Sequence, residues 1–321
     1  MSREEIIALL GDDWTAFQRL LRESLHSGID IIDSFNEYVL SRSGKQLRPM
    51  LTLLVAGALG GINGDSVRFA ALAEILHNAT LLHDDVADDG TVRRGEPTIY
   101  ATSGAQSSVL LGDYWLASVV DLVVDAGSAD AIKSCSATLA DLARGEMLQM
   151  QKAALADTTE EDYLDIIFCK TASLFQTSCR MGAISAGASP QMCEAAAKFG
   201  SSLGTAFQIK DDIFDYGDSS AIGKPVGSDL MERKITLPLI GALRGSPEEA
   251  RIRSVVAAIP EHPEGCAEVR DFVLNGGGIE YAEARLQDFL DEALEALSAF
   301  PPSSYRDALE SLTHYVSQRS V

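Results

Sequence analysis

The sequence has 321 residues and a formal net charge of −21 at neutral pH, from 47 acidic and 26 basic residues. Hydrophobic residues make up 46% of the chain and charged residues 23%, which is ordinary for a protein with a large core and excludes disordered and fibrous classes. The acidic balance argues against a nucleic-acid partner, because such a partner requires clustered basic surface. It does not exclude a small anionic ligand, which responds to the local field of a few cations.

Cysteine usage and the apolar segments indicate a cytoplasmic protein. The cysteines are odd in number, lack the spacing of paired metal ligands and mostly lie among apolar residues, so we expect reduced thiols. The first residues, MSREEIIALLGDD, lack the basic-then-apolar pattern of a signal peptide. The most membrane-like stretch, 109–124, is interrupted by Asp113 and Asp121 and is too short to span a bilayer. We therefore expect no transmembrane segment. The cysteines are Cys135, Cys169, Cys179, Cys193 and Cys266.

Apolar residues recur at helical spacing along almost the whole chain, and alternating strand-like runs are nearly absent. The pattern predicts an all-α fold, with a helical bundle as the expected architecture. Helix starts are predicted, in chain order, at Thr158 with Glu161, at Ser189-Pro190 and at 246–249. A last helix is predicted from one apolar stripe that comprises Ile279, Ala282, Leu286, Phe289, Leu290, Ala293, Leu294 and Leu297.

Glycine and proline collect in four places that we predict to be loops: 89–97, 216–227, 260–265 and 275–278. None of them has the length or the low complexity of a domain linker. We therefore predict a single domain that covers residues 1–321.

Two acidic clusters echo each other along the chain. Asp84-Asp85-xx-Asp88 follows an apolar helical run from Ala71 to Leu82, and Asp211-Asp212-xx-Asp215 ends a second such run. In a helix, residues four apart share a face, so each cluster presents a carboxylate pair.

A solvated acidic helix end would explain one such cluster, but it explains two less well. Like charges about 4 Å apart repel by roughly 4 kcal/mol at an effective dielectric of ~20, and carboxylates at a helix C-terminus also oppose the helix dipole. Cations would relieve both terms. All-oxygen ligands suit magnesium, which combines a few carboxylates with phosphate oxygens and water. The clusters therefore indicate a diphosphate held through magnesium.

Basic residues occur where a diphosphate would need them. Lys45 and Arg48 lie three apart in the segment GKQLRP, and Arg93 and Arg94 follow the first acidic cluster. In so acidic a chain, these positions favour anion binding. Further cations stand in the middle of the chain and around the second cluster: Lys170, Lys210, Lys224, Arg233 and Lys234.

Taken in order, these segments resemble the trans-type polyprenyl diphosphate synthase family. The two-residue gap in the first aspartate motif and the wording ATLLHDD are most similar to the long-chain octaprenyl and solanesyl diphosphate synthases of that family. The matching segments run over about residues 40–240. They are GKQLRPM from Gly44, EILHNATLLHDDVADDGTVRRGEPT from Glu74, LLGDYW from Leu110, GEMLQ from Gly145, KTASLF from Lys170, FQIKDDIFD from Phe207 and GKPVGSDLMERKITLPL from Gly223.

The resemblance implies a homodimer of helical subunits of the isoprenoid synthase type, each with a central cavity. It implies a prenyltransferase that condenses isopentenyl diphosphate with an allylic diphosphate. It also implies three magnesium ions per active site, held by Asp84, Asp88 and Asp211. Asp85, Asp212 and Asp215 would support those ligands. A transient contact with a membrane would serve the release of the apolar product.

The resemblance also divides the remaining site residues between the two substrates. The allylic diphosphate would be held by Arg93, Lys170 and Lys224. Isopentenyl diphosphate would be bound by Lys45, Arg48, His77 and Arg94, with Lys234 as a further substrate-binding cation. Thr171 and Gln208 would face the developing carbocation, so that Lys170, Thr171, Gln208 and Lys224 form the catalytic set.

Small residues before the first aspartate cluster favour a long product. Ala79 and Thr80 stand five and four residues before Asp84, or about 6 to 7.5 Å along a helix at 1.5 Å per residue. In this family, enzymes that stop at farnesyl length commonly place bulky aromatic residues at this level. The growing prenyl tail would run from the aspartates along this helix into the protein, in a tunnel that Leu76, one turn deeper, would be the first side chain to narrow. We therefore expect an octaprenyl-like product. The alternative, less favoured interpretation of Ala79 is that it only allows close helix packing.

Four other functions stay open at this stage. A shorter-chain farnesyl or geranylgeranyl diphosphate synthase would share every motif. A terpene cyclase would share the first aspartate motif, but its second motif usually mixes Asn, Ser or Thr with Glu. A phosphohydrolase of the His-Asp type would use the pair His83-Asp84, yet His26, His262 and His314 lie in unpromising settings for further ligands. A non-catalytic partner subunit would have lost aspartates or basic ligands, which this chain keeps.

Overall fold

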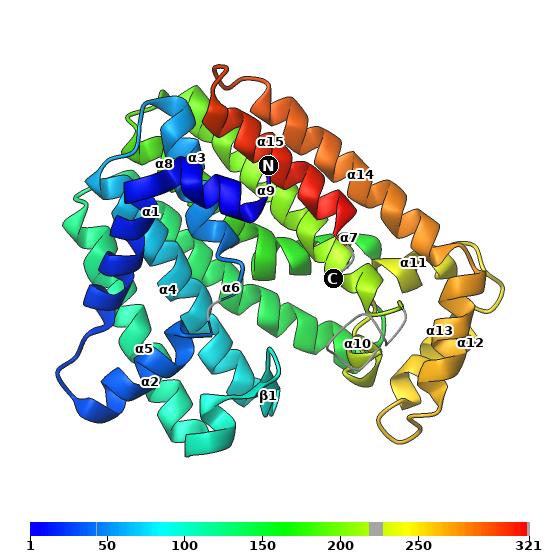
Figure 1. Cartoon of the computed structure of the whole chain (residues 1–321). Coiled ribbons are helices and arrows are strands. Elements are labelled where there is room, and N and C mark those ends of the chain that lie inside the picture. Colours follow the sequence, from blue (N-terminus) through cyan, green and yellow to red (C-terminus); the bar gives the residue numbers. More distant parts are fainter. Residues whose placement is uncertain (43, 218–226, 320–321) are drawn as a thin grey trace. The chain divides into compact units, whose positions relative to one another are not determined.

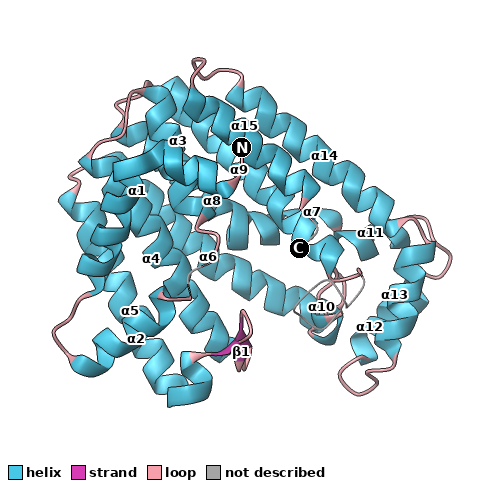
Figure 2. Ribbon diagram, in the orientation of Figure 1, coloured by secondary structure: helices cyan, strands magenta, loops and turns pink. Residues whose placement is uncertain are grey.

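The computed structural model describes residues 1–42, 44–217 and 227–319. Within this part of the chain nearly every element is a helix, and the only two strands are the short pair β1 (Val92–Arg93) and β2 (Glu96–Pro97) (Figure 2). The strands are antiparallel, with Val92 opposite Pro97. The all-α prediction is confirmed, and the predicted loop at 89–97 contains this small hairpin.

The chain forms two compact units. The first comprises Met1–Ser136, Thr177–Ala197 and Ala299–Leu309, and the second comprises Ala137–Gln176, Lys198–Ser298 and Glu310–Val321. The single domain expected over residues 1–321 stays a prediction.

In the first unit, α4 packs against α1, α3 and α5. A central helix of this kind has to be apolar almost all round, and α4 buries residues on every side from Phe69 to Ala79. The helices that belong to this unit alone are α1 (Arg3–Leu25), α2 (Asp30–Leu40), α3 (Leu47–Leu59), α4 (Gly64–Ala87) and α5 (Ile99–Asp125) (Figure 1).

A buried tryptophan ties α5 to α2. The indole N–H of Trp115 donates to Asn36 Oδ1 at 2.7 Å, and the Asn36 amide donates to the Leu25 carbonyl at 2.5 Å. Both side chains are buried. The pair satisfies donors that would otherwise be stranded in the core, because a buried indole N–H needs an acceptor.

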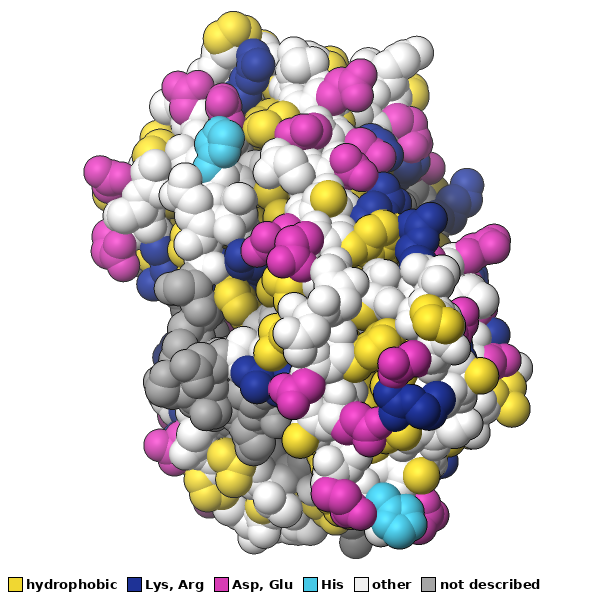
Figure 3. Space-filling view, turned by 90° about the vertical axis from the view of Figure 1, so that its right-hand side faces the viewer, with side chains coloured by type: hydrophobic (Ala, Val, Ile, Leu, Met, Phe, Trp, Pro, Cys, Tyr) yellow, Lys and Arg dark blue, Asp and Glu magenta, His cyan; other side chains and the backbone are white. Residues whose placement is uncertain are grey.

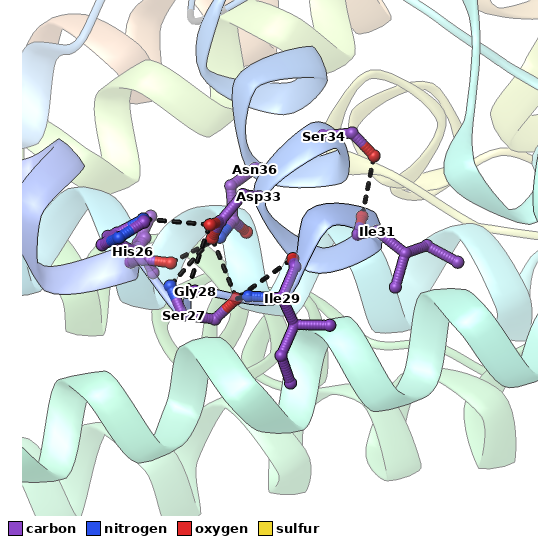
Figure 4. Close-up of polar contacts among 9 residues, drawn as sticks. His26, Ser27, Gly28, Ile29, Ile31, Asp33, Ser34 and Asn36 are labelled. Atoms are coloured by element: carbon purple, nitrogen blue, oxygen red, sulfur yellow. Dashed lines mark hydrogen bonds and ion pairs between the residues drawn. The ribbon is translucent and has the colours of Figure 1, made fainter.

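Asp33 organises the turn between α1 and α2 (Figure 4). Its carboxylate accepts from the Ser27 backbone N–H at 2.8 Å, from the Ser27 hydroxyl at 2.9 Å and from the Gly28 N–H at 3.2 Å. His26 Nδ1 lies 2.9 Å from the same carboxylate. The Ser27 backbone donor is the main cause that lowers the pKa of Asp33. One side chain therefore fixes the entry to α2.

The apolar stretch expected at 109–124 lies in α5, which is longer than the sequence indicated. Helix α5 has 27 residues, and the mean hydropathy of its most apolar window is 1.4, so by length and composition alone it could cross a membrane. The expectation of no transmembrane segment stays a prediction. However, 44% of its most apolar window is buried inside the protein, and the helix packs against α4.

The second unit holds the later helices, and α12 and α13 lie side by side in it (Figure 1). The predicted stripe from Ile279 to Leu297 is confirmed as α14, which packs against α11. The helices of this unit are α7 (Glu160–Ile167), the π-helix η1 (Phe168–Ala172), α10 (Ser228–Met231), α11 (Leu237–Leu243), α12 (Glu249–Ala258), α13 (Gly265–Asn275) and α14 (Gly278–Leu297).

The residues of four further helices are divided between the units: α6 (Ala129–Leu155), α8 (Ser173–Ser185), α9 (Pro190–Phe214) and α15 (Ser304–Gln318). The predicted start at Ser189-Pro190 is confirmed as that of α9, where the Ser189 hydroxyl accepts from the Met192 N–H at 3.3 Å. The predicted loops at 260–265 and 275–278 coincide with the starts of α13 and α14.

The start expected at Thr158 was wrong by one residue. Thr159 caps α7 instead: its hydroxyl accepts from the Asp162 N–H at 3.2 Å, and the Asp162 carboxylate accepts from the Thr159 N–H at 3.0 Å. Thr158 is buried, and its carbonyl accepts from Arg253 at 3.3 Å. The tertiary contact therefore decides which of two adjacent threonines becomes the cap.

All five cysteines are free thiols, and all but Cys266 are buried. Burial raises the pKa of the Cys135 thiol to about 11, so this thiol stays protonated at neutral pH. On the face drawn in Figure 3, acidic, basic, hydrophobic and uncharged side chains are mixed.

Candidate active site

The first aspartate cluster lies at the C-terminal end of α4. Asp84 and Asp85 belong to its last turn, and Asp88 is the C-cap residue, whose N–H donates to the Asp84 carbonyl at 2.9 Å. Asp85 is buried, Asp84 is partly exposed and Asp88 is exposed. The helix therefore presents Asp84 and Asp88 outward and turns Asp85 into the protein.

Asp85 is neutralised by Arg93 from strand β1. Arg93 Nε and Nη2 both lie 2.8 Å from Asp85 Oδ1. Burial raises the pKa of Asp85, and the charge of Arg93 offsets part of that rise. The hairpin after α4 thus returns a cation to the cluster that precedes it.

The basic segment from Gly44 to Pro49 leads into α3 and is held by Arg94. A Cβ atom on Gly44 would lie only 2.7 Å from Arg94 Nη2, so the guanidinium packs where only glycine leaves room. Arg94 Nη1 also donates to the Arg42 carbonyl at 2.7 Å. Gln46 and Arg94 both adopt positive φ, 53° and 54°. Such backbone strain in non-glycine residues is concentrated at functional sites.

Two titratable groups of α4 lie among these arginines, the buried Glu74 and the partly buried His77. Burial raises the pKa of Glu74, while Arg48, Asn78 and Arg94 pull it down. The Asn78 amide donates to Glu74 Oε1 at 3.2 Å. Burial also holds the pKa of His77 well below its usual value, helped by repulsion from Arg48 and Arg94. His77 is therefore a neutral imidazole at neutral pH, and Glu74 is the carboxylate that faces the arginines.

The second aspartate cluster lies at the C-terminal end of α9. Asp211 and Asp212 belong to its last turn, and Asp215 follows it. Asp215 Oδ2 accepts from the Asp229 N–H of α10 at 3.1 Å. Asp211 forms an ion pair with Arg319.

Asp212 is buried and held by two side chains. The Tyr163 hydroxyl donates to Oδ2 at 2.7 Å, and the Gln208 amide donates to Oδ1 at 2.8 Å. Gln208 in turn accepts from the Thr171 hydroxyl at 2.7 Å. Burial raises the pKa of Asp212 well above its usual value, with a further contribution from Asp229. The structure thus brings Thr171, Gln208 and Asp212 into one hydrogen-bonded chain.

Lys170 and Thr171 lie in the π-helix η1 rather than in regular α-helix. Single π-helical turns cost stability and recur at functional sites. Lys170 Nζ lies 2.7 Å from Glu146 Oε1 and donates to Gln149 Oε1 at 3.0 Å. Gly145 of α6 allows this approach, because a Cβ atom there would lie 2.7 Å from Cys169 Cβ and 2.8 Å from Lys170 Cγ.

The other two predicted lysines are placed as follows. Lys224 lies outside the described residues. Lys234 pairs with Glu232, and its backbone N–H donates to the Asp229 carbonyl at 2.8 Å. Lys234 therefore follows α10 and is bonded to Asp229, the residue whose backbone N–H donates to Asp215.

The first aspartate cluster belongs to the first unit and the second aspartate cluster to the second unit. Within the described residues, no group of three or more His, Cys, Asp or Glu side chains is arranged to hold a metal ion. Each cluster offers a pair of less buried carboxylates, Asp84 with Asp88 and Asp211 with Asp215, whereas Asp85 and Asp212 are occupied by protein donors. Such a donor set fits magnesium, which takes one or two carboxylates and completes its shell with phosphate oxygens and water.

Five residues at these clusters have no role in the sequence analysis: Glu74, Asn78, Glu146, Tyr163 and Arg319. Glu74 and Asn78 are four apart on α4, so helical spacing would have paired them. Nothing in the sequence would have joined Tyr163 to Asp212, Glu146 to Lys170 or Arg319 to Asp211, because these contacts are tertiary.

Comparisons with known proteins show the family of the chain. A family profile described as polyprenyl synthetase matches residues 29–273. The chain is 38% identical to an all-trans-nonaprenyl-diphosphate synthase (geranyl-diphosphate specific) of Rhodobacter capsulatus, over 99% of this chain and 98% of that protein. It is 36% identical to the octaprenyl diphosphate synthase of Escherichia coli, over 99% of both chains.

A solved structure is similar over the same length. The crystal structure of a polyprenyl synthase from Caulobacter crescentus, complexed with calcium and isoprenyl diphosphate, superposes with a TM-score of 0.92 at 33% identity. The match covers 100% of this chain and 98% of that chain.

We expect Gly145→Ala to destabilise the protein. Alanine normally stabilises a helix interior relative to glycine by roughly 1 kcal/mol. Here, however, its Cβ atom would make two contacts under 3 Å, which would force Cys169 and Lys170 of η1 away from α6 at a cost of about 1 to 3 kcal/mol. Thermal unfolding should therefore show a lower Tm. Gly64→Ala is the matched control, because no heavy atom lies within 4 Å of a Cβ there. An unchanged Tm for both variants would contradict the close approach at Gly145.

Proposed function

The chain belongs to the polyprenyl synthetase family and is a prenyltransferase, and on this premise we propose that it adds isopentenyl diphosphate to an allylic diphosphate to make a linear, octaprenyl-like trans-polyprenyl diphosphate. One observation carries the proposal. Two helices each carry at their C-terminal end a pair of less buried carboxylates and a third, buried one, in a chain that matches long-chain synthases over nearly its whole length.

Magnesium is the proposed cofactor, three ions per active site, with Asp84, Asp88 and Asp211 as its ligands. When bound, it stabilises the negative charge that develops on the diphosphate leaving group. Asp85 and Asp212 support these ligands from inside the protein, because both already accept from protein donors. Asp215 is proposed in the same supporting role, tied to the start of α10.

Two groups of basic residues are proposed to bind the two substrates. Lys45, Arg48, His77 and Arg94 would bind isopentenyl diphosphate. This assignment is supported by Arg48 and Arg94, whose charges act on both Glu74 and His77. Because His77 is neutral, it offers a hydrogen bond rather than a charge. The allylic diphosphate would be held by Arg93, Lys170 and Lys224, with Lys234 as a further cation.

The chemistry follows from charge separation. The allylic C–O bond breaks, and the electron pair leaves with the diphosphate, whose charge Lys170 and Lys224 stabilise. The allylic cation that remains needs a site with weak dipoles and no nucleophile, which Thr171 and Gln208 provide. The double bond of isopentenyl diphosphate then forms the new C–C bond, and the released diphosphate accepts the proton that is lost. No side chain forms a covalent intermediate.

The proposed long product rests on α4. Ala79 is 0% exposed and Leu76 is also buried, while α5, the helix expected to form the opposite wall, packs against α4. A small side chain five residues before Asp84 leaves space for a growing tail. Each added five-carbon unit that becomes buried gains roughly 4 kcal/mol at about 0.8 kcal/mol per carbon. The chain therefore grows until a bulkier side chain stops it.

A homodimer is proposed through the outer face of α5. Leu110, Ala117 and Val124 follow one another at seven-residue spacing and are exposed, and Val120 lies beside them. Leu110 is 58%, Val120 50% and Val124 55% exposed. An apolar stripe of this length on a helix favours burial against a second copy. Sedimentation equilibrium at the mass of one chain would contradict the dimer.

The enzyme is proposed to work in the cytoplasm, with transient membrane contact when it releases its apolar product. The free thiols are what a reducing compartment allows. A His-Asp phosphohydrolase is disfavoured, because His83 lies 3.3 Å from the Val109 carbonyl and 3.4 Å from Asp113 instead of facing further histidines.

Removal of a proposed metal ligand should abolish synthesis. We expect Asp84→Ala, Asp88→Ala or Asp211→Ala to lower kcat by orders of magnitude, because each variant loses a magnesium ligand. Asp215→Ala should be milder. The measurement is product formation from radiolabelled isopentenyl diphosphate with added magnesium, with circular dichroism as the control for folding. Near-normal turnover in any of the first three variants would refute the assignment, and wild-type product made without any divalent ion would refute the cofactor.

A bulky side chain at the tunnel level should shorten the product. We expect Ala79→Phe to shift the product from octaprenyl-like length toward farnesyl or geranylgeranyl diphosphate, as read by chromatography of the dephosphorylated products. Ala79 is fully buried, so Thr80→Phe, at a partly exposed position, is the variant to use if the first does not fold. If wild type already stops at farnesyl, the open tunnel is wrong. An unchanged product from both variants would show that the tail takes another path.

A further inference from the structure

Arg319 stands just after the last helix, α15, yet its side chain is only 4% exposed. Arginine is almost never fully buried without a partner. The contacts of the Arg319 side chain explain this burial.

The side chain of Arg319 contacts the C-terminal part of α9, from Phe207 to Phe214, while its backbone N–H donates to the Tyr315 carbonyl of α15 at 2.9 Å. Nη2 donates to the Phe207 carbonyl at 2.9 Å and forms the ion pair with Asp211 Oδ1. The guanidinium stacks over the Phe207 ring, with its carbon 3.9 Å from the ring centroid, and lies 5.3 Å from that of Phe214. The plane of the guanidinium is thus fixed by a ring, a carbonyl and a carboxylate.

The position of the Arg319 guanidinium does not pair all of its own hydrogen-bond donors. Nε is buried and has no acceptor among the described residues. A guanidinium that only closed the fold would be expected to use its donors more fully, since buried donors are nearly always paired. The contact that distinguishes the position is the one to Asp211, whose carboxylate stands at the C-terminal end of a helix and opposes the helix dipole.

We propose that Arg319 is a positioning residue for Asp211: by holding Oδ1 against the end of α9, it orients the carboxylate so that Oδ2 binds magnesium. This inference rests on the proposed function, in which Asp211 is a metal ligand. Carboxylates that bind metals are commonly held by a second hydrogen-bond partner, and loss of that partner typically costs 10- to 100-fold in metal affinity. The planar guanidinium suits the task because it stacks and donates at the same time.

The test measures metal binding by the whole protein without substrate. We would titrate wild type, Arg319→Gln and Arg319→Lys with Mn²⁺ alone and read free Mn²⁺ by electron paramagnetic resonance. We expect 10- to 100-fold weaker binding in Arg319→Gln and a partial loss in Arg319→Lys, which keeps the charge but not the stacked, planar contact. Arg306→Gln is the matched control, since it removes the same charge from α15 and Arg306 bonds the Phe300 carbonyl at 3.1 Å instead. In synthesis, the magnesium activation constant of Arg319→Gln should rise while the KM for isopentenyl diphosphate stays unchanged.

Three results would overturn the inference. Tighter Mn²⁺ binding in Arg319→Gln would mean that the arginine competes with the metal. Unchanged binding with a lower Tm would make Arg319 a structural anchor. Equal weakening in Arg306→Gln would reduce the effect to net charge. If Arg319→Gln does not fold, Arg319→Lys carries the same comparison. The proposed function is tested separately, by the synthesis assays of Asp84→Ala, Asp88→Ala and Asp211→Ala, which do not involve Arg319.

Discussion

Repulsion between carboxylates at the ends of two helices is the constraint on which the rest of the site depends. Each of α4 and α9 ends in three aspartates, where the helix dipole is also unfavourable. In each cluster the protein relieves part of this cost: Arg93 neutralises Asp85, and Tyr163 with Gln208 satisfies Asp212. Pairs of less buried carboxylates are left on each helix.

In the first unit, Arg48 and Arg94 form a basic cluster in which the repulsion is between positive charges. Arg48 and Arg94 would repel each other and any further cation, and burial makes that repulsion stronger. Glu74 lies among them as a buried carboxylate, and His77 stays neutral. The cluster therefore keeps a positive field for an anion without an excess of buried charge. A net charge of −21 for the whole chain is compatible with this local field.

Backbone geometry at both clusters departs from regular helix where functional side chains project. Gln46 and Arg94 adopt positive φ, and Lys170 and Thr171 lie in a π-helical turn. Glycines make the close approaches possible, Gly44 beside Arg94 and Gly145 beside η1. Such local costs persist when the surrounding packing fixes them, and here the surrounding helices do so.

The sequence by itself determined the all-α fold, the start of α9, the apolar stripe of α14 and the family, because helical periodicity and the two aspartate motifs are local patterns. It also predicted the residue types of the site, since charges four apart on a helix must share a face. Only the tertiary structure decided which side chain holds each aspartate: Arg93 of a hairpin pairs with Asp85, a tyrosine 49 positions away donates to Asp212, and Arg319 pairs with Asp211. It also moved the cap of α7 to Thr159 and placed Lys170 on a π-helix. These outcomes depend on contacts between distant segments, which no local pattern encodes.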